Sequence, residues 1–506
     1  MGKYSKRLHT SVTGASAIMI ALSGCSSAVK PEAAAATATA DNPVSVNYMF
    51  DFNVDLTEGT LLKNKYVDFL QKKTGVKVVM DAPSSAGYND KLNIMMASGS
   101  PPDAFMTSTR DTILKFASQG LLTDLSPYIN DAAKYPNIAK FMKKEAFLPV
   151  TQDGKIYAFP YSRFDALTQT VYINKLWMEK LNLKTPKTIE DFYQVGKAFT
   201  EQDPDGNGKN DTFGFLSISG LTYIGQLFSA SMDANFYKII DGKVTPPEIT
   251  NEYKEYLKFM RKLVKDKLLD PEFVTTTTQI YMDKLKTGKY GITSNFWHAN
   301  QFPGYEDGTV DKVWEAMDLP VKMDGSPAKF SYNSINRHYI GIPASSKNTE
   351  ALMKFFDWVC SDEGKKWLYL GVEGDEYKMT DGKPEILKQK HSLHWGFSMI
   401  NPGQYDDEVK SYLGLVYPKA SIDRLDNAIK NGALDQLQAA LPYYPELSSF
   451  SLTKISDEYK VKAVLGNSDI DSTWDDYVKS WRSAGGDKAI QFWTDWYNKE
   501  GKNLIK

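Results

Sequence analysis

The sequence predicts an α/β fold with two domains, and three observations lead to this prediction. A strand-like segment, a helical segment and a second strand-like segment follow one another between residues 44 and 80, which is the order of a βαβ unit. The same alternation starts again near residue 168. The chain of 506 residues is also longer than one hydrophobic core usually organises.

The first domain is expected to begin near Pro43 with the elements of a parallel sheet. Apolar and polar residues alternate from Val44 to Phe50 as in a strand, and apolar residues then recur at helical spacing from Leu61 to Lys73. Further elements are expected as a strand over 77–80, a helix over 89–97, a strand over 103–106 and an extended segment over 153–160.

The second domain is expected to contain a strand over 168–173, a helix over 174–181 and a helix that begins after Thr188. Asp191 lies three residues after Thr188, which is the spacing of a capping box. From about residue 411 helical patterns dominate, and their aromatic residues are interpreted as core: Trp474, Tyr477, Trp481, Phe492, Trp493, Trp496 and Tyr497.

The N-terminus has the pattern of a bacterial export signal. Three basic residues precede an apolar run from Ser11 to Leu22, which is shorter than the roughly 20 residues needed to cross a membrane. The residues up to Cys25 (LSGC) resemble the lipobox of bacterial lipoproteins, in which the cysteine is diacylated. An ordinary secretory signal with a chance cysteine is the alternative. Residues 26–42, rich in Ala and Thr, are interpreted as a flexible tether.

Composition narrows the classes of function. A net charge of −2 lacks the basic footprint of a nucleic-acid binder, so no nucleic-acid partner is expected. Cys360 is the only cysteine besides Cys25, which excludes a disulfide framework or a zinc cluster once Cys25 is acylated, and we expect Cys360 to be buried. An aromatic content of 13% suits a sugar partner, although most of these rings must be core.

Six stretches carry a resemblance to a known family. They are residues 93–103 (NIMMASGSPPD), 154–161 (GKIYAFPY), 172–177 (YINKLW), 203–211 (DPDGNGKND), 371–374 (GVEG) and 474–477 (WDDY). Taken together and in this order, they resemble the extracellular sugar-binding proteins of ABC importers, and they are similar to the long alginate-oligosaccharide binders among them.

This resemblance implies an α/β, two-lobed fold of the periplasmic-binding-protein type II, with hinge strands and a helical C-terminal extension. The implied organisation is a signal peptide over 1–24, a tether over 25–42, one lobe from 43–162 and 336–385, and a second lobe from 166–332 and 386–506. The chain would cross between the lobes near 162–165 and 333–337. Closure of the lobes on an oligosaccharide would present it to the ABC permease subunits.

The same resemblance, together with the lipobox, implies a location. The protein is expected to be a monomer, attached by an N-terminal lipid to the outer face of the bacterial cell membrane, on the periplasmic or extracellular side. Two acyl chains give stable attachment, whereas one chain binds a membrane only marginally.

One loop has the spacing of a calcium site. Asp203, Asp205, Asn207, Lys209 and Asp211 match positions 1, 3, 5, 7 and 9 of an EF-hand loop, with Gly208 at the glycine position and Lys209 offering its carbonyl. Position 12 holds Gly214 instead of Glu, and Thr212 stands where the alginate binders place a further acid. We expect a structural Ca²⁺, with a polar turn as the alternative.

The segment over 291–298 (GITSNFWH) is the strongest candidate for ligand contact. It looks like the segment that supplies a sugar-stacking Trp in maltose-type binders, so Trp297 is expected to stack on a pyranose while Asn295 and His298 bind hydroxyls. The alternative is that Trp297 is core.

Other ligand candidates lie close to the implied crossings. Arg163 and Arg337 can make bidentate contacts and would favour a polar or acidic sugar, unless they are solvated surface residues. The remaining candidates are Asn333, Tyr339, Ser108, Phe52, Asn53 and Tyr88.

Two other classes of function compete with an importer component. A secreted carbohydrate-active enzyme, either a hydrolase or a lyase, would need placed catalytic groups, such as two carboxylates across a glycosidic bond. The sequence has no Gly-x-Ser-x-Gly, His-Glu-x-x-His or Gly-Lys-Ser/Thr motif, which favours a binding protein over an enzyme. A sugar sensor or adhesin on the same fold is the other alternative.

The stacking role of Trp297 makes a prediction. Tight ligand raises the melting temperature by mass action, so a Trp297→Ala variant should lose the thermal shift that an oligosaccharide gives the unmodified protein. Differential scanning fluorimetry measures this, and an unchanged shift in the variant would remove Trp297 from the ligand contacts.

Overall fold

The computed structural model describes residues 39, 41–50, 60–162, 169–218, 221–305, 308–390 and 393–505. These residues belong to one compact unit, residues 38–506. The expected signal peptide, Cys25 and most of the expected tether lie outside the described residues, as do Phe52, Asn53 and Arg163.

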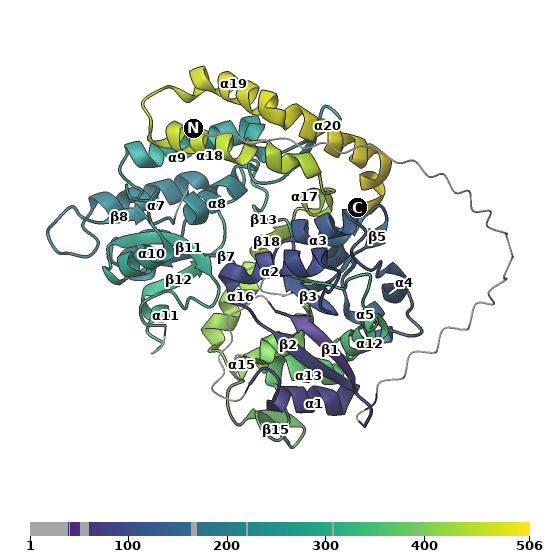
Figure 1. Cartoon of the computed structure of the whole chain (residues 1–506). Helices are drawn as coiled ribbons and strands as arrows, with labels where there is room; N and C mark the ends of the chain where they lie inside the picture. The colour runs from purple at the N-terminus through teal and green to yellow at the C-terminus, as the bar shows by residue number, and fades with distance from the viewer. Residues whose placement is uncertain are drawn as a thin grey trace, which may run out of the picture. The chain divides into compact units, whose positions relative to one another are not determined.

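A six-stranded sheet gathers residues that are far apart in the sequence (Figure 1). Its order is β17 (Asn401–Pro402), β6 (Ala158–Ser162), β14 (Asn336–Gly341), β3 (Ala104–Thr107), β1 (Val44–Met49) and β2 (Val76–Asp81). β1 is parallel to β2 and to β3, which confirms the predicted βαβ unit. β14 is antiparallel to both of its neighbours, so the sheet is mixed.

Two apolar clusters belong to this sheet, because successive side chains of a strand point to opposite faces. Tyr48 belongs to one cluster and the next residue, Met49, belongs to the other. The helices of this part are α1 (Lys65–Thr74), α2 (Ser85–Ala97), α3 (Arg110–Ser118), α4 (Ser126–Ile129), α5 (Pro136–Phe141), α12 (Thr349–Val359), α13 (Asp362–Leu370) and α14 (Leu393–Ser398). Cys360 is buried at the end of α12, as expected.

A second sheet has four strands in the order β12 (Trp314–Met317), β7 (Gln169–Asn174), β11 (Tyr290–Phe296) and β8 (Phe213–Phe215). All six residues of β7 are buried, as is usual for a central strand. The accompanying helices are α6 (Lys175–Lys180), α7 (Ile189–Glu201), α8 (Thr222–Ser231), α9 (Asn251–Lys265), α10 (Thr278–Lys286) and α11 (Val310–Val313). The capping box of Thr188 and Asp191 at α7 is confirmed.

The C-terminal part is mainly helical, as predicted. Its elements are α15 (Asp407–Gly414), α16 (Lys419–Asn431), β18 (Gly432–Leu434), α17 (Gln436–Ala440), α18 (Leu452–Leu465), α19 (Ile470–Trp481), α20 (Asp487–Trp496) and α21 (Lys502–Leu504). Figure 1 shows α18 and α19 beside α9, and both helices contact it. Trp474, Tyr477, Trp481 and Trp493 are buried in the same cluster as α9, which confirms their interpretation as core.

Short strand pairs and single turns of helix complete the described chain. β13 (Phe330–Tyr332) pairs with β18, and the hairpins are β4 (Thr151–Gln152) with β5 (Lys155–Ile156), β9 (Lys238–Ile240) with β10 (Lys243–Thr245), and β15 (Tyr377–Thr380) with β16 (Lys383–Ile386). The short helical segments are η1 (Lys144–Val150), η4 (Pro247–Ile249), η5 (Pro445–Ser449), η6 (Arg482–Gly486) and η7 (Tyr497–Gly501). Within the described ranges, no helix is both long enough and apolar enough to span a bilayer.

The chain passes between the two sheets at adjacent positions. It leaves the larger sheet after β6 at Ser162, and it returns to that sheet with β14 at Asn336, which is paired with Ser162. The Asn336 side chain is buried, accepts a hydrogen bond from Ser162 Oγ at 2.5 Å and donates one to the carbonyl of Ala146 at 2.6 Å. Ser162 and Asn336 lie in the two ranges, 162–165 and 333–337, where the chain was predicted to cross between the lobes.

A third connection follows β17, which extends the larger sheet beyond residue 385, where the prediction ended the first lobe. After β17, α15 contacts α13, a helix that accompanies the larger sheet. The next helix, α16, contacts β7 and β12 of the smaller sheet. The lobe boundaries themselves stay a prediction.

Helix α7 lies directly against β8, and two glycines make this contact possible. A Cβ added at Gly214 would lie 2.3 Å from the carbonyl oxygen of Gly196, whereas one added at Gly87 in α2 would lie 3.6 Å from its nearest neighbour, Ser84 Oγ. A Gly214→Ala substitution should therefore lower the free energy of unfolding by about 1–3 kcal/mol, because backbone must move to admit it. Gly87→Ala is the control, expected to raise stability by roughly 0.5–1 kcal/mol. Urea denaturation compares the two variants, and equal stabilities would contradict the close contact.

Candidate ligand-binding site

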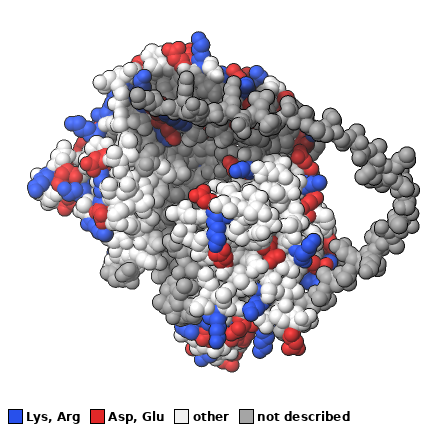
Figure 2. Space-filling view, viewed as in Figure 1, with Lys and Arg blue, Asp and Glu red and all other residues white. Residues whose placement is uncertain are grey.

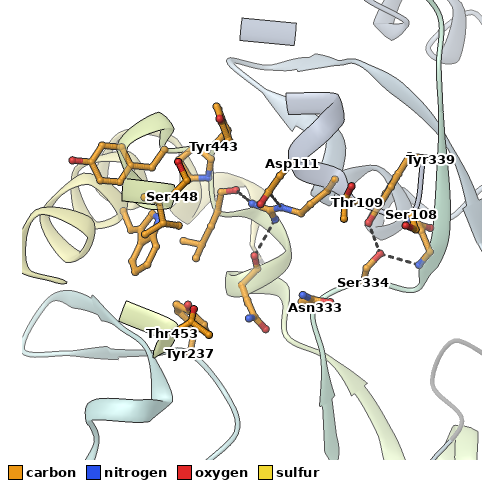
Figure 3. Close-up of a pocket in the computed structure, with 18 of the residues that line it drawn as sticks. Ser108, Thr109, Asp111, Tyr237, Asn333, Ser334, Tyr339, Tyr443, Ser448 and Thr453 are labelled. Atoms are coloured by element: carbon orange, nitrogen blue, oxygen red, sulfur yellow. Dashed lines mark hydrogen bonds and ion pairs between the residues drawn. The ribbon is translucent and has the colours of Figure 1, made fainter. Parts of the chain in front are cut away.

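A cavity of about 630 Å³ lies between the turn after β3, the segment that leads into β14, and the C-terminal part of the chain. Figure 3 shows these groups facing one another across an open space, with Ser108, Thr109 and Tyr339 on one side and Tyr443 and Ser448 on the other. Pockets at the carboxyl ends of parallel strands are a common place for ligands in α/β proteins. The cavity is therefore the candidate site.

The turn after β3 brings polar side chains to the cavity. β3 ends at Thr107 and α3 begins at Arg110, so Ser108 and Thr109 form the connection. The Thr109 hydroxyl is held by Thr107 Oγ1 at 3.2 Å and by Thr112 Oγ1 at 3.0 Å. This fixes the turn from which Ser108 faces the cavity.

Arg110 joins this turn to the C-terminal part of the chain. Its guanidinium donates hydrogen bonds to the carbonyls of Gln438 at 3.2 Å, Ala439 at 2.7 Å and Leu441. These carbonyls lie at the C-terminal end of α17, where a cation is favourable. Asp111 Oδ1 lies 3.5 Å from Arg110 Nε. We call the three hydrogen bonds from Arg110 to the carbonyls of Gln438, Ala439 and Leu441 the Arg110 clamp.

Aromatic residues form much of the remaining lining. Tyr237 packs against Trp493 with ring centroids 5.9 Å apart, and Tyr444 stacks on Phe492 at 4.5 Å. Tyr443 is half-buried and lines the same cavity. Aromatic faces of this kind pack well against the apolar face of a sugar ring.

Two tyrosine hydroxyls at the cavity are held in their neutral form. Burial raises the pKa of both Tyr237 and Tyr339 above the ordinary value, because a buried phenolate is poorly solvated. Tyr339 also shares a hydrogen bond of 2.9 Å with Ser334 Oγ. Both hydroxyls therefore stay protonated over a wider pH range than an exposed tyrosine.

Three of the predicted ligand residues line the cavity, namely Ser108, Asn333 and Tyr339. Arg337 is exposed and lies outside the lining, although it comes from the same segment. Tyr88 is fully buried, and its hydroxyl donates to backbone carbonyls of Met49 and Met106. The ligand-binding roles of all these residues stay predictions.

Trp297 lies elsewhere, in a small apolar cluster with α15 and α16. Its side chain is 2% exposed and packs with Val409, Leu413 and Leu425, and its ring lies 5.1 Å from that of Tyr417. Arg424 Nε donates to the Trp297 carbonyl at 2.9 Å. A Trp297→Ala substitution would thus remove buried packing, so its effect on ligand binding has to be read from folded protein.

The other two residues of this predicted segment also lie outside the lining of the cavity. Asn295 is buried, and its amide donates to Tyr281 Oη at 3.2 Å and to Gln301 Oε1 at 2.9 Å. His298 is half-buried, with its ring stacked on Phe296 at 5.6 Å.

The predicted calcium loop is held by hydrogen bonds among its own residues. The Asn207 amide donates to Asp205 Oδ2 at 2.8 Å and to Asp211 Oδ1 at 3.1 Å, so these two carboxylates already surround one positively polarised group. Gly208 N donates to Asp203 Oδ2 at 3.0 Å. This hydrogen bond is the main cause of the lowered pKa of Asp203. Lys289 pairs with Asp211 at 2.8 Å and lowers its pKa.

The donor set of this loop fits a hard cation, since it offers carboxylate, amide and carbonyl oxygens. Gly214 cannot be replaced by the usual Glu, because the backbone of Gly196 lies against it. In the described part of the chain, however, no three His, Cys, Asp or Glu side chains are gathered as a metal site. The calcium ion stays a prediction.

Sequence reasoning missed most of the C-terminal contribution to the cavity. The missed residues are Tyr237 and, from the C-terminal part, Gln438, Leu441, Pro442, Tyr443, Tyr444, Leu447, Ser448, Phe450, Thr453 and Trp493. The stretch 441–450 (LPYYPELSSF) combines aromatic, proline and hydroxyl residues without helical spacing, which was the available signal of an exposed functional segment.

Comparisons with known proteins agree on one family. Residues 53–366 match the family model described as bacterial extracellular solute-binding protein. The chain is 28% identical over 455 residues to the polygalacturonan/rhamnogalacturonan-binding protein YtcQ of Bacillus subtilis, which covers 85% of this chain and 87% of that protein. It is also 28% identical over 310 residues to the fructooligosaccharide ABC transporter substrate-binding protein FusA of Streptococcus pneumoniae, which covers 57% and 56%.

Solved structures share the fold over nearly the whole chain. FusA of S. pneumoniae in complex with kestose gives a TM-score of 0.66 at 22% identity, covering 91% of this chain and 100% of that one. The alginate-binding protein AlgQ2 without calcium ion gives 0.65 at 20% identity, covering 91% and 99%. The expected two-lobed α/β fold with a helical C-terminal extension is confirmed.

The Arg110 clamp predicts a loss of stability on substitution. Arg110→Gln removes three charge-assisted hydrogen bonds from carbonyls at the end of α17, and it should lower the free energy of unfolding by about 1.5–3 kcal/mol. Lys115→Gln, on the exposed face of the same helix α3, is the control with the same change of charge. Urea denaturation measures the free energy of unfolding of both variants. An equally small decrease in the two would argue against the clamp.

Proposed function

The chain belongs to the bacterial extracellular solute-binding protein family, and from this premise we propose that it is the oligosaccharide-binding component of a carbohydrate ABC importer. The oligosaccharide binds in the cavity between the β3–α3 turn, the segment before β14 and the C-terminal part. Closure of the two lobes around it gives the arrangement that the permease subunits recognise. The names of the relatives YtcQ and FusA support a carbohydrate ligand.

The lining of the cavity is the observation that carries this proposal. It combines aromatic rings, such as Tyr443 and Trp493, with hydroxyl and amide groups, such as Ser108, Asn333 and Thr453. Sugars present apolar ring faces and hydroxyl edges, and they are held by the same combination of stacking and hydrogen bonding. The parts that meet here are distant in sequence, which suits a site that forms as the lobes close.

We propose that the protein binds the sugar without altering it. Hydrolysis of a glycosidic bond needs two carboxylates at a fixed separation, and the described lining contributes one carboxylate, that of Asp111. A secreted hydrolase or lyase is the alternative, and a sensor on the same fold is another. A sensor requires the same liganded closure but a receptor in place of the permease.

The location follows from the N-terminal sequence and the family. We propose that Cys25 carries the lipid that holds a monomer on the outer face of the cell membrane. On the face shown in Figure 2, basic and acidic side chains are interspersed, which suits a partner other than nucleic acid. Membrane fractionation of cells that carry Cys25→Ala tests the anchor, since the variant should appear in the soluble fraction.

The loop from Asp203 to Asp211 is proposed to hold a structural Ca²⁺. Asp203, Asp205, Asn207 and Asp211 would contribute side-chain oxygens, and Lys209 its carbonyl. The names of two related structures, AlgQ2 without calcium ion and an EF-hand mutant of FusA, support this proposal. The ion would fix the loop between α7 and β8, away from the lining of the cavity.

A glycan panel tests the proposed function. An oligosaccharide at about 100 times its dissociation constant should stabilise the folded protein by about 2.7 kcal/mol, which a thermal melt detects as a rise in melting temperature. Prolonged incubation with the same sugar should leave it intact by chromatography. New reducing ends or unsaturated products would establish the enzyme instead, and a flat response to all oligosaccharides would reject the binding function.

Removal of calcium tests the metal proposal. A chelator such as EGTA should lower the melting temperature, because loss of an ion that binds the folded state removes its stabilisation. Asp203→Asn with Asp205→Asn should abolish the difference between calcium-loaded and chelated protein, and Asp90→Asn on the exposed surface of α2 is the control. An identical melting temperature with calcium and with EGTA would show that the loop is held by its own hydrogen bonds.

A further inference from the structure

We infer that the cavity selects an uncharged oligosaccharide and disfavours uronic acids, and that Asp111 sets this preference. The inference rests on the proposed function, which leaves the class of sugar open. It also differs from what the name of YtcQ would lead one to assume, because the galacturonic acid units of polygalacturonan carry a carboxylate. Three features of the cavity lead to it.

The first feature is that the cation at the cavity is already engaged. Among the described residues that line it, Arg110 is the only Lys or Arg, and its guanidinium donates to the carbonyls of Gln438, Ala439 and Leu441. The N–H groups left for a bidentate contact with a uronate lie on the Nε side of the guanidinium, where Asp111 Oδ1 already lies 3.5 Å from Nε. Turning Arg110 to the ligand would take one charge-assisted hydrogen bond from each of these three carbonyls.

The second feature is a carboxylate at the same place. Asp111 lines the cavity with a side chain that is 70% exposed, and its Oδ1 lies 3.5 Å from Arg110 Nε. Figure 3 shows Asp111 at the edge of the open space. A uronate bound there would meet a like charge, and like charges placed together discriminate strongly against a ligand.

The third feature is a set of neutral polar groups that are left for a ligand. Within the described part of the chain, the side chains of Ser108, Asn333 and Thr453 line the cavity and make no hydrogen bond to protein. The Tyr237 and Tyr339 hydroxyls are kept neutral by burial. Neutral donors and acceptors of this kind match sugar hydroxyls. The faces of the surrounding rings carry partial negative charge, which suits a carboxylate poorly.

The test compares ligands that differ in the carboxylate alone. Isothermal titration calorimetry of the purified protein would use galacturonan oligosaccharides and galactan oligosaccharides of equal length and linkage, together with neutral fructo- and malto-oligosaccharides. A neutral sugar should bind at least about tenfold more tightly than any uronate of the same length. Its affinity should change by less than about twofold between low salt and about 0.3 M salt, because screening has no ligand charge to act on.

The role of Asp111 has its own variant. Asp111→Asn should shift the ratio of uronate to neutral affinity by about tenfold towards the uronate, because it removes the like charge. Asp90→Asn makes the same change of net charge on α2 outside the cavity, and it should leave the ratio unaltered. Thermal melts of both variants establish that they are folded before the ratios are compared.

The outcomes separate the inference from the function on which it rests. A uronate that binds as tightly as the neutral sugars, with an affinity that falls with salt, would overturn the inference and leave the importer function standing. An Asp111→Asn ratio equal to that of Asp90→Asn would overturn the assignment of selectivity to Asp111. Failure of all oligosaccharides to bind would reject both the proposed function and the inference.

Discussion

The structure depends on the buried contacts of Asn336. At this point the chain returns to the larger sheet beside Ser162, where it left that sheet. The Asn336 side chain accepts from Ser162 and donates to Ala146, so β6, β14 and η1 are held at one point. A buried amide costs free energy unless both its ends are paired, which makes this position intolerant of slippage. Asn333 precedes β14 and Tyr339 lies within it, so the same contact fixes one wall of the cavity.

Local sequence signals predicted much of the fold. The alternation over 44–50, the capping box at Thr188 and the aromatic helices near the C-terminus each depend on neighbours within a few residues, and each is confirmed. The participation of β17 in the larger sheet has no such signal. Two residues, Asn401 and Pro402, pair with a strand some 240 positions earlier, and nothing in a dipeptide indicates that partner.

The candidate site was harder to predict, for the same physical reason. Ser108 and Asn333 each follow a strand and Tyr339 lies in one, and the three could be placed by strand order and resemblance. Tyr237 and Trp493 reach the cavity together because α20, which carries Trp493, packs on β10, and Tyr443 lies in the stretch that follows α17. For Trp297, the local sequence suggested a ligand contact that distant packing does not favour. A tryptophan at a strand end resembles a sugar-stacking residue, but here α15 and α16 enclose it.

The clamp has an evolutionary consequence. Arg110 recognises carbonyl oxygens of Gln438, Ala439 and Leu441, and every amino acid supplies such an oxygen. The identities at these three positions can therefore drift in descendants of this chain while the guanidinium keeps its partners. The arginine has no equivalent freedom, because lysine lacks the planar fork that reaches several carbonyls together. The side chains of the C-terminal wall of the cavity can therefore change in evolution while Arg110 on the opposite wall is retained.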